Sequence, residues 1–380
     1  MEHFDVIIVG AGPAGSVTAH TLAKNNISCA VFERRRAPGF PVCCGEAVSE
    51  ASLKAAGLFH GSYIDKKIEG FRIFFPNGKY FAVKSPGCLI NREKFDRHVF
   101  DLAVGAGAKP FLRHTVVSAK KTETGFEVFT NSGSFTCKYL VGADGPKSII
   151  DALFFNNRRK LADAVQYKLP KPAYRYDSGA YIDFFYDHIS GYYMWLFDKS
   201  KEINAGGCVA DKELLRGFIK KHLGVEESGH IGFCRGAIPS GGIKDKIFND
   251  NVFLVGDAAG LVNPVTLAGI HSALLSGKIC AYCIFGEVRL GKKESPAIYE
   301  KVIKKQPFAS KELKYLASRC FTLPESVLNF LGEYFDSRDN TYKNPFKFIK
   351  LAFKYPAVPA NIKPLFMLRK LLKTGADKLW

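Results

Sequence analysis

The chain has 380 residues, which is enough for two intertwined domains and an appendage. Hydrophobic residues make up 47% and charged residues 24%, as in an ordinary globular protein, and no apolar run reaches the ~18 residues of a membrane-spanning helix. The formal net charge of +18 points to an acidic partner: an anionic membrane surface, an acidic protein, a phosphorylated substrate or nucleic acid. The basic residues are mostly lysines scattered among aliphatic residues, without a nucleic-acid-binding motif, so nucleic acid is not expected.

The N-terminal sequence MEHF leads directly into DVIIVG, which is typical of a buried strand and not of the apolar segment of a cleavable signal peptide. We therefore expect a cytoplasmic protein whose ten cysteines are mostly reduced. Cys280 and Cys283 form a CxxC inside a helical run, and we expect both to be small buried apolar residues. No second CxxC accompanies this one, as it would in a CxxC…CxxC metal site, so no metal site is predicted.

The first 33 residues predict a strand, a glycine-rich turn, a helix and a second strand. DVIIVG is followed by GAGPAG and then by the helical stretch SVTAHTLAKN. Gly10 permits the tight turn, Gly12 lets the backbone approach a pyrophosphate, and Gly15 lets the helix pack close to the strand. The second strand, SCAVFE, ends at Glu33, whose carboxylate can accept hydrogen bonds from a ribose hydroxyl. The segment predicts a dinucleotide-binding unit.

The stretch FPVCCGEAVSE (40–50) places two adjacent thiols, a glycine and a carboxylate just after this unit. On their own, these residues are compatible with four alternatives: a fragment of a metal site, a disulfide, a reactive pair of thiols or an ordinary loop. Zinc is not expected, because no second ligand pair follows.

Two later segments identify the nucleotide. YLVGADGPKS (139–148) is a predicted strand ending at Asp144 and Gly145, and NVFLVGDAAG continues a strand into Gly256 and Asp257. The three motifs, in this order and spacing, resemble the FAD-dependent group that includes aromatic hydroxylases and geranylgeranyl reductases. The resemblance implies that Asp257 accepts hydrogen bonds from a ribitol hydroxyl. The helix that starts near Gly269 would direct its positive end at the flavin.

Within this group, the chain is similar to the geranylgeranyl reductases. PVCCGEAVS resembles the segment that these enzymes carry after the second strand, with Cys44 at the matching position. GYYMWLF resembles their YxWxFP substrate motif as Tyr193, Trp195 and Phe197, with Asp198 in place of the proline. GDAAGLVNPVTLAGI is close to their third motif, with Leu267–Ala268 in place of the usual Gly-Glu. The resemblance covers roughly residues 1–290.

The resemblance also implies the residues of the FAD site, several of them from the motifs above. The expected cofactor residues are Gly10, Gly12, Ala14, Gly15, Glu33, Cys44, Gly45, Ala47, Arg92, Val116, Asp144, Gly145, Gly256, Asp257, Gly269 and Ile270.

The implied reaction is reduction of C=C bonds in geranylgeranyl or polyprenyl chains of membrane lipids or their precursors. It needs hydride from reduced flavin N5 and a proton from an acid. Cys44 is the first candidate for this acid, directly or through water, and Glu46 is the second. Tyr193, Trp195 and Phe197 are expected to form the apolar wall that holds the chain over the flavin.

The predicted fold class is α/β, with a Rossmann-like FAD-binding domain, an inserted α+β substrate domain built on an antiparallel sheet, and a helical C-terminal tail. The expected domains are 1–70, 88–160 and 245–295 (FAD-binding), 71–87 and 161–244 (substrate), and 296–380 (C-terminal helical region).

The last forty residues, 341–380, contain nine Lys or Arg and one Asp, interleaved with Phe, Leu, Ile and Trp. This pattern suits an interfacial helix on an anionic membrane, and equally a helix packed on the body with its lysines outward. We therefore expect a cytoplasmic, peripheral membrane enzyme that acts on a polyprenyl lipid. Two alternatives keep the same fold: a flavin monooxygenase or halogenase, and a flavin electron-transfer protein. The electron donor is NAD(P)H or ferredoxin.

Overall fold

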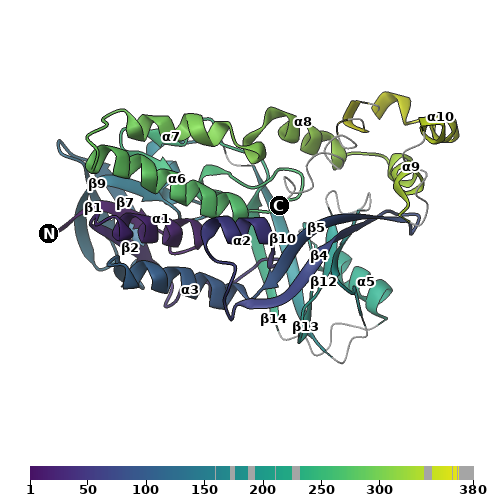
Figure 1. Cartoon of the computed structure of the whole chain (residues 1–380), viewed down its shortest axis with the longest axis horizontal. Helices are drawn as coiled ribbons and strands as arrows, with labels where there is room; N and C mark the ends of the chain where they lie inside the picture. The colour runs from purple at the N-terminus through teal and green to yellow at the C-terminus, as the bar shows by residue number, and fades with distance from the viewer. Residues whose placement is uncertain are drawn as a thin grey trace.

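The structure is a computed structural model, and it describes residues 1–158, 160–171, 176–186, 193–209, 211–224, 232–337, 345–361, 363–365 and 367. Of the forty residues 341–380, nineteen lie outside this set, including all those after residue 367. The chain builds two sheets and a group of C-terminal helices (Figure 1). The mixed α/β architecture with two sheets confirms the predicted fold class.

The first sheet is parallel at its centre, in the order β15-β16-β9-β1-β2-β6, and β7 and β8 extend β9 as an antiparallel meander. In the central strands, Ile8 of β1 is aligned with Val31 of β2 and Val141 of β9, and all three side chains are buried. Apolar β-branched runs of this kind suit a sheet covered on both faces. The strands are β1 (Glu2–Val9), β2 (Cys29–Glu33), β6 (Lys109–Leu112), β7 (Val116–Lys121), β8 (Phe126–Thr130), β9 (Gly133–Gly142), β15 (Phe248–Asn249) and β16 (Val252–Leu254).

Helices cover this sheet. Helix α1 packs against both α3 and α6, and α7 lies over α6 (Figure 1). The α1 helix is buried along most of its length, because Gly, Ala, Ser, Val and Thr present little bulk to the strands. These helices are α1 (Pro13–Lys24), α3 (Arg92–Gly105), α4 (Ile149–Phe154), α6 (Ile270–Val288) and α7 (Ser295–Lys304), with a short 3-10 turn η1 (Gly256–Ala259) before α6.

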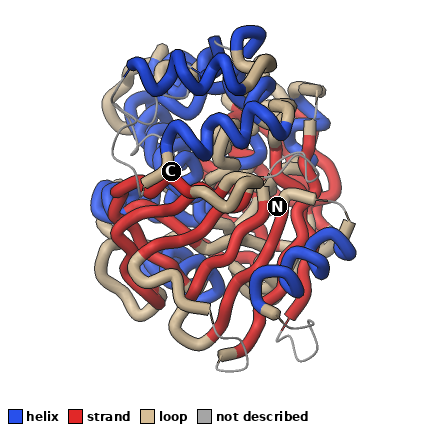
Figure 2. The backbone as a smooth tube through the Cα atoms, turned by 90° about the vertical axis from the view of Figure 1, so that its right-hand side faces the viewer, coloured by secondary structure: helices blue, strands red, loops and turns tan. Residues whose placement is uncertain are grey.

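The second sheet has the order β14-β10-β13-β12-β11-β4-β5-β3, and every pair is antiparallel except β4 with β11. Figure 2 shows its strands side by side in one curved layer. The expected substrate segment 71–87 lies inside this sheet, but β4 and β5 pair beyond both of its ends. The strands are β3 (Ala47–Ser49), β4 (Ile64–Phe74), β5 (Tyr80–Ile90), β10 (Leu161–Pro170), β11 (Tyr181–Phe185), β12 (Met194–Asp198), β13 (Glu202–Gly207) and β14 (Gly232–Pro239).

The two faces of the second sheet have different roles. Met194 and Leu196 of β12 pack toward α5 (Lys212–Leu223), while Trp195 and Phe197 turn to the opposite face. This alternation follows from the period of two along a strand. The aromatic face of the sheet is thus free to wall a cavity, and the helix-covered face supplies the core.

The C-terminal helices lie beyond the second sheet's β4–β5 hairpin. Phe75 and Phe81 of the hairpin region pack into one apolar cluster with α9 residues such as Phe330 and Phe335. The elements are η2 (Pro307–Ala309), α8 (Lys311–Cys320), α9 (Glu325–Phe335), α10 (Pro345–Lys354) and η4 (Pro359–Asn361), and a short α2 (Glu50–Ala56) follows β3. Among the helices of the described ranges, none combines the length and the apolar character needed to cross a membrane.

Candidate active site

A cavity of about 350 Å³ lies where the first sheet's loops meet the aromatic face of the second sheet. One end is walled by the start of α1 and by Asp257. The middle is walled by the β12 aromatic side chains, and the far end by α8 and α9 residues such as Cys320 and Leu331. Its lining is predominantly apolar, so the cavity suits a hydrocarbon chain that reaches a polar end.

The glycine loop after β1 lets neighbouring backbone segments lie close together. Gly10 has φ +105°, and a Cβ there would lie 2.4 Å from the carbonyl oxygen of Ala143. A Cβ on Gly15 would lie 2.0 Å from the carbonyl oxygen of Gly10, so both positions require glycine. At Gly12 a Cβ would meet nothing within 4 Å, and Gly12 lines the cavity. No side chain caps α1, whose first N–H groups lack acceptors inside the helix. This open, uncapped helix start fits a pyrophosphate.

Glu33, at the end of β2, holds the glycine loop in place. One carboxylate oxygen accepts a hydrogen bond from the Ala11 N–H at 3.0 Å, and the other accepts from the Arg35 N–H at 2.9 Å. A carboxylate has about four acceptor positions, so both oxygens can still accept from a ribose hydroxyl. The Glu33 side chain does not line the cavity itself.

Asp257, at the start of η1, lies half-buried on the cavity wall. Burial raises the pKa of its carboxyl to about 6, although the charge of Arg92 opposes this shift. Within the described ranges no hydrogen-bond donor to this carboxylate is recorded, which leaves it available to a ligand hydroxyl. A Cβ on Gly269 would lie 3.2 Å from Oδ1 of Asp257, so glycine lets the start of α6 approach the carboxylate. Helix α6, like α1, has no side-chain cap at its N-terminus.

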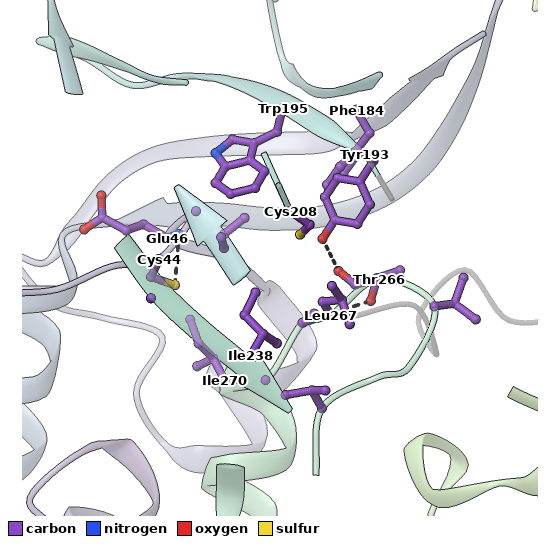
Figure 3. Close-up of a pocket in the computed structure, with 18 of the residues that line it drawn as sticks. Cys44, Glu46, Phe184, Tyr193, Trp195, Cys208, Ile238, Thr266, Leu267 and Ile270 are labelled. Carbon is purple, nitrogen blue, oxygen red and sulfur yellow. Dashed lines mark hydrogen bonds between the residues drawn. The ribbon is translucent and has the colours of Figure 1, made fainter. Parts of the chain in front are cut away.

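The loop before β3 brings Cys44 into the cavity (Figure 3). Its sulfur accepts a hydrogen bond from the Glu46 N–H at 3.3 Å, and its backbone oxygen accepts from Asn204 Nδ2 at 2.9 Å. Burial raises the pKa of the Cys44 thiol, although the nearby charge of Arg92 opposes the shift. The group is therefore a protonated thiol at neutral pH.

Glu46 points the other way in Figure 3, away from Trp195 and Ile270. Its Oε2 lies 2.6 Å from Lys199 Nζ and 3.3 Å from Lys168 Nζ, and its Oε1 accepts from the Arg92 N–H at 2.9 Å. Burial would raise the pKa of Glu46, but the two lysines outweigh it and the pKa is lowered. An ionised, ion-paired carboxylate has no proton to give, so the geometry favours Cys44 over Glu46 as the acid.

Cys43, next to Cys44, also lines the cavity. A Cβ on Gly236 of β14 would lie 3.3 Å from the Cys43 sulfur, and the Cys43 thiol lies near that of Cys234. The Cys44 sulfur lies beside Arg92 instead.

Arg92, at the first position of α3, lines the cavity and is held by its own helix. Its Nε donates to Asp96 Oδ1 at 2.8 Å, and a terminal nitrogen donates to Asp96 Oδ2 at 2.9 Å. Burial would lower the pKa of Arg92, but the Asp96 carboxylate outweighs it and raises the pKa. The cavity thus keeps one fixed positive charge near both Cys44 and Asp257.

Tyr193, Trp195 and Phe197 form a row of rings along one wall, with ring centroids 6.2 and 6.0 Å apart. Tyr193 donates its hydroxyl hydrogen to the carbonyl oxygen of Thr266, and Trp195 Nε1 donates to Asn204 Oδ1 at 2.9 Å. The polar atoms of Tyr193 and Trp195 therefore have partners within the protein, and the ring faces remain for an apolar ligand.

The two departures from the reductase motifs have structural roles here. Asp198 is buried, and its carboxylate accepts from Lys66 Nζ at 2.8 Å and pairs with Lys171. Leu267 has φ +56°, an unusual conformation for a leucine, and its side chain lines the cavity. Leucine thus adds apolar bulk at a turn where glycine would fit without strain.

The structure brings most of the predicted site residues to one cavity. The predicted residues that line it are Gly12, Ala14, Cys44, Gly45, Glu46, Ala47, Arg92, Gly145, Tyr193, Trp195, Phe197, Asp257, Gly269 and Ile270. Six do not line it: Gly10, Gly15, Glu33, Val116, Asp144 and Gly256.

Val116 and Asp144 have other partners. Val116 begins β7 and pairs with Thr130 in the outer meander. Asp144 Oδ2 accepts from the Ile149 N–H at 2.6 Å, at the start of α4, so this carboxylate fixes the turn that presents Gly145 to the cavity.

Sequence reasoning missed the residues that support the site. Lys199 and Lys168 hold Glu46, Asn204 binds both Trp195 and the backbone of Cys44, and Gly206 faces Trp195 across the strand pair. No local motif marks these residues. The nearest signal in the sequence is the pair of adjacent glycines in INAGGCV, which leave room for a large side chain on the neighbouring strand.

Comparisons with known proteins show which proteins this chain is similar to. Residues 3–155 match the FAD binding domain family. The chain is 30% identical over 308 residues to a digeranylgeranylglycerophospholipid reductase of Methanococcus vannielii, an alignment that covers 74% of this chain and 78% of that protein. It is 28% identical over 405 residues to the digeranylgeranylglycerophospholipid reductase of Thermoplasma acidophilum, covering 96% of this chain and 100% of that one.

A solved structure shows the same architecture. The crystal structure of a geranylgeranyl bacteriochlorophyll reductase-like protein from Thermoplasma acidophilum superposes with a TM-score of 0.83 and 26% sequence identity. The match covers 96% of this chain and 100% of that chain, and so includes both sheets and the C-terminal helices.

Proposed function

The chain belongs to the geranylgeranyl reductase family of FAD-dependent oxidoreductases, and from this premise we propose that it saturates C=C bonds in the geranylgeranyl chains of membrane lipids or of their precursors. The observation that carries the proposal is the position of Cys44: a half-buried, protonated thiol in an apolar cavity, between the predicted FAD-binding loops and a wall of aromatic rings.

In this proposal, one group of residues binds FAD, and a second group binds and protonates the alkene. The uncapped start of α1 at Gly12 would hold the pyrophosphate, Glu33 a ribose and Asp257 a ribitol hydroxyl. When bound and reduced, FAD supplies a hydride to one carbon of the alkene. The cavity keeps water away from this carbon, because its walls are apolar.

The chain itself supplies the proton. The Cys44 thiol gives its hydrogen to the second carbon of the alkene, and the thiolate is reprotonated from solvent before the next turnover. Positive charge that develops on the more substituted carbon faces the rings of Tyr193, Trp195 and Phe197, an attraction of about 0.5–2 kcal/mol. Arg92 lies beside the sulfur and stabilises the thiolate once the proton has left.

We further propose that the enzyme works at an anionic membrane surface. Helix α10 exposes Phe353 (86%) next to the basic residues Lys350 and Lys354. An exposed aromatic ring among lysines is the arrangement of an interfacial helix. The electron donor in this proposal is NAD(P)H or an acidic ferredoxin, and the basic surface suits the latter.

The decisive experiment is lipid mass spectrometry after co-expression with a pathway that makes unsaturated geranylgeranyl lipids. We expect a mass gain of one H₂ for each saturated double bond. Oxygen-dependent hydroxylated or halogenated products, with no saturated chains, would instead assign the monooxygenase or halogenase chemistry. Flavin that is reoxidised only by another protein would assign an electron-transfer role.

A further inference from the structure

A second cavity, of about 950 Å³, opens between the segment before η1 and the junction of α7 and α8. Five lysines line it against two acidic residues, Asp245 and Glu312. The lysines are Lys244, Lys304, Lys305, Lys311 and Lys314. We call this cavity the lysine cleft.

The charge of the lysine cleft is only partly neutralised. Lys244 is buried and pairs with Asp151 at 2.6 Å, and Lys304 pairs with Glu300 at 2.5 Å. Across the described ranges no ion pair is recorded for Lys305, Lys311 or Lys314, and all three are exposed. Three lysines of one cavity are therefore available to an anion.

The floor of the cleft is apolar. Ile243, Leu313, Leu316 and Met367 line it below the lysines. A cationic rim over an apolar floor is complementary to an amphiphile that has an anionic head and a hydrocarbon chain, and less so to a free inorganic ion.

The cleft and the active-site cavity share a wall. Leu313 and Leu316 of the cleft belong to one apolar cluster with Val265 and Cys320, both of which line the active-site cavity. One layer of side chains separates the two spaces. Along α8, Lys311 and Cys320 are about 13 Å apart by helix rise, a distance that an extended diterpenoid chain can cover.

From these contacts we propose that the lysine cleft binds the phosphate or diphosphate head group of the isoprenoid whose chain enters the active-site cavity. The inference rests on the proposed function, because it places the polar end of the same substrate. Lys305, Lys311 and Lys314 donate charge-assisted hydrogen bonds to phosphate oxygens. The apolar floor receives the first part of the chain, and the layer of side chains that includes Leu313 and Leu316 moves aside so that the rest of the chain enters the active-site cavity.

The test uses the FAD-loaded full chain and calorimetric binding of three probes: geranylgeranyl diphosphate, geranylgeraniol and inorganic diphosphate. The variant is Lys305→Gln/Lys311→Gln/Lys314→Gln. The control is Lys212→Gln/Lys292→Gln/Lys293→Gln, which removes the same charge from exposed lysines that do not line the cleft. Both variants are first checked for bound flavin and for a cooperative unfolding transition.

We expect the cleft variant to bind geranylgeranyl diphosphate about tenfold more weakly or worse, while its affinity for geranylgeraniol changes by less than about twofold. The control variant should match the wild type with both probes. Unchanged diphosphate affinity in the cleft variant would overturn the proposal, and so would an equal loss for the alcohol. Inorganic diphosphate that binds as tightly as the prenyl diphosphate would also overturn it, in favour of a free-phosphate site.

Two experiments distinguish an error in the head-group site from an error in the proposed reductase function. Reduction of geranylgeraniol, followed by flavin reoxidation, reports the reductase chemistry without any phosphate. If this alcohol is reduced but the cleft variant binds the diphosphate normally, only the head-group site is wrong. If no prenyl chain is reduced while diphosphate binding still depends on the three lysines, the reductase proposal is wrong.

Discussion

Lys199, in the turn after β12, lies with its ammonium nitrogen 2.6 Å from a carboxylate oxygen of Glu46, in the loop that carries Cys44. The two side chains are 3% and 1% exposed, so this is a buried ion pair. The pair connects residues 153 positions apart in the sequence. It fastens the Cys44 loop to the turn that follows the strand bearing Trp195, and thus sets the thiol and the aromatic wall relative to each other.

Replacing Lys199 by Met should destabilise the fold by about 3 kcal/mol, because Glu46 would remain buried with only the partly exposed Lys168 as its ionic partner. Urea unfolding monitored by flavin and tryptophan fluorescence would measure this change. Lys201→Met, two residues away and exposed, is the matched control and should change the free energy of unfolding little.

The Lys199–Glu46 ion pair also predicts how the free energy of unfolding depends on pH. The pKa of Glu46 is lowered in the folded protein, so its contribution to stability is present above the unfolded value, about 4.3, and is lost as the pH falls through the folded value. The stability difference between the wild type and Lys199→Met should therefore shrink in acid. A difference that is the same at neutral and at strongly acidic pH would show that the Lys199 substitution acts through packing alone.

Asp257→Ala should weaken FAD retention by about 1–3 kcal/mol, because a ribitol hydroxyl loses its acceptor. With a pKa of about 6, the Asp257 carboxyl is ionised at pH 7.5 and protonates as the pH falls below 6, so wild-type FAD affinity should fall over that range. Ultrafiltration and flavin absorbance at several pH values measure both effects. Asp257→Asn should flatten the pH dependence, and the exposed Asp250→Ala is the control.

The sequence predicted those parts of the site that are local in the chain. A β-branched strand, three spaced glycines and a helix are contiguous, so Gly10, Gly12 and Gly15 could be placed at the turn between the first strand and the first helix. The C-terminal ends of the strands that follow could be placed near them, because parallel strands end at one edge of a sheet. The Cys44 loop came from resemblance to a family segment, and it does line the cavity.

The supporting contacts could not be predicted, because they depend on strand pairing between distant segments. Lys199 approaches Glu46 only after β12 joins the sheet that contains β3. The antiparallel pairing of β4 with β5 carries the second sheet past the expected limits of 71–87. The parallel pairing of β4 with β11 joins distant segments, and no turn signal marks a pairing of this kind. Val116, which the resemblance implies for the FAD site, begins β7 of the outer meander, a position set by its pairing with β8.

Gly206→Ala should impair alkene reduction by displacing the Trp195 ring. A Cβ at Gly206 would lie 2.1 Å from Trp195 Cζ2, and the two residues are paired across β12 and β13. We expect slower flavin reoxidation by the alkene and a changed tryptophan fluorescence. Gly207→Ala, on the other face, would meet the flexible Met194 side chain at 3.1 Å and should be tolerated. Equal activity of both variants would show that Trp195 does not shape the substrate wall.

The C-terminal segment predicts salt-dependent membrane binding. Residues 341–380 carry nine Lys or Arg against one Asp, and exposed charges are screened over about 8–10 Å at physiological ionic strength. In a vesicle sedimentation assay, binding should require anionic lipid and decrease with added salt. Equal binding to neutral vesicles would contradict the electrostatic contribution. Binding that survives deletion of 341–380 would assign the segment a structural role.

Cys44→Ser and Cys44→Ala should bind FAD and accept electrons normally, yet reduce the alkene at least about tenfold more slowly, which is about 1.4 kcal/mol in barrier. The reason is that a serine hydroxyl is a far weaker acid than a thiol, whose ordinary pKa is about 8.5, and alanine has no proton to give. Stopped-flow absorbance separates flavin reduction by the donor from flavin reoxidation by the alkene, and only the second phase should slow. Cys43→Ser is the matched control, since that thiol lies against Gly236 and near Cys234, whereas the Cys44 thiol lies beside Arg92. If Cys44→Ala leaves reoxidation unchanged, a bound water supplies the proton. If Cys43→Ser is the damaging change instead, the two adjacent thiols have the opposite roles.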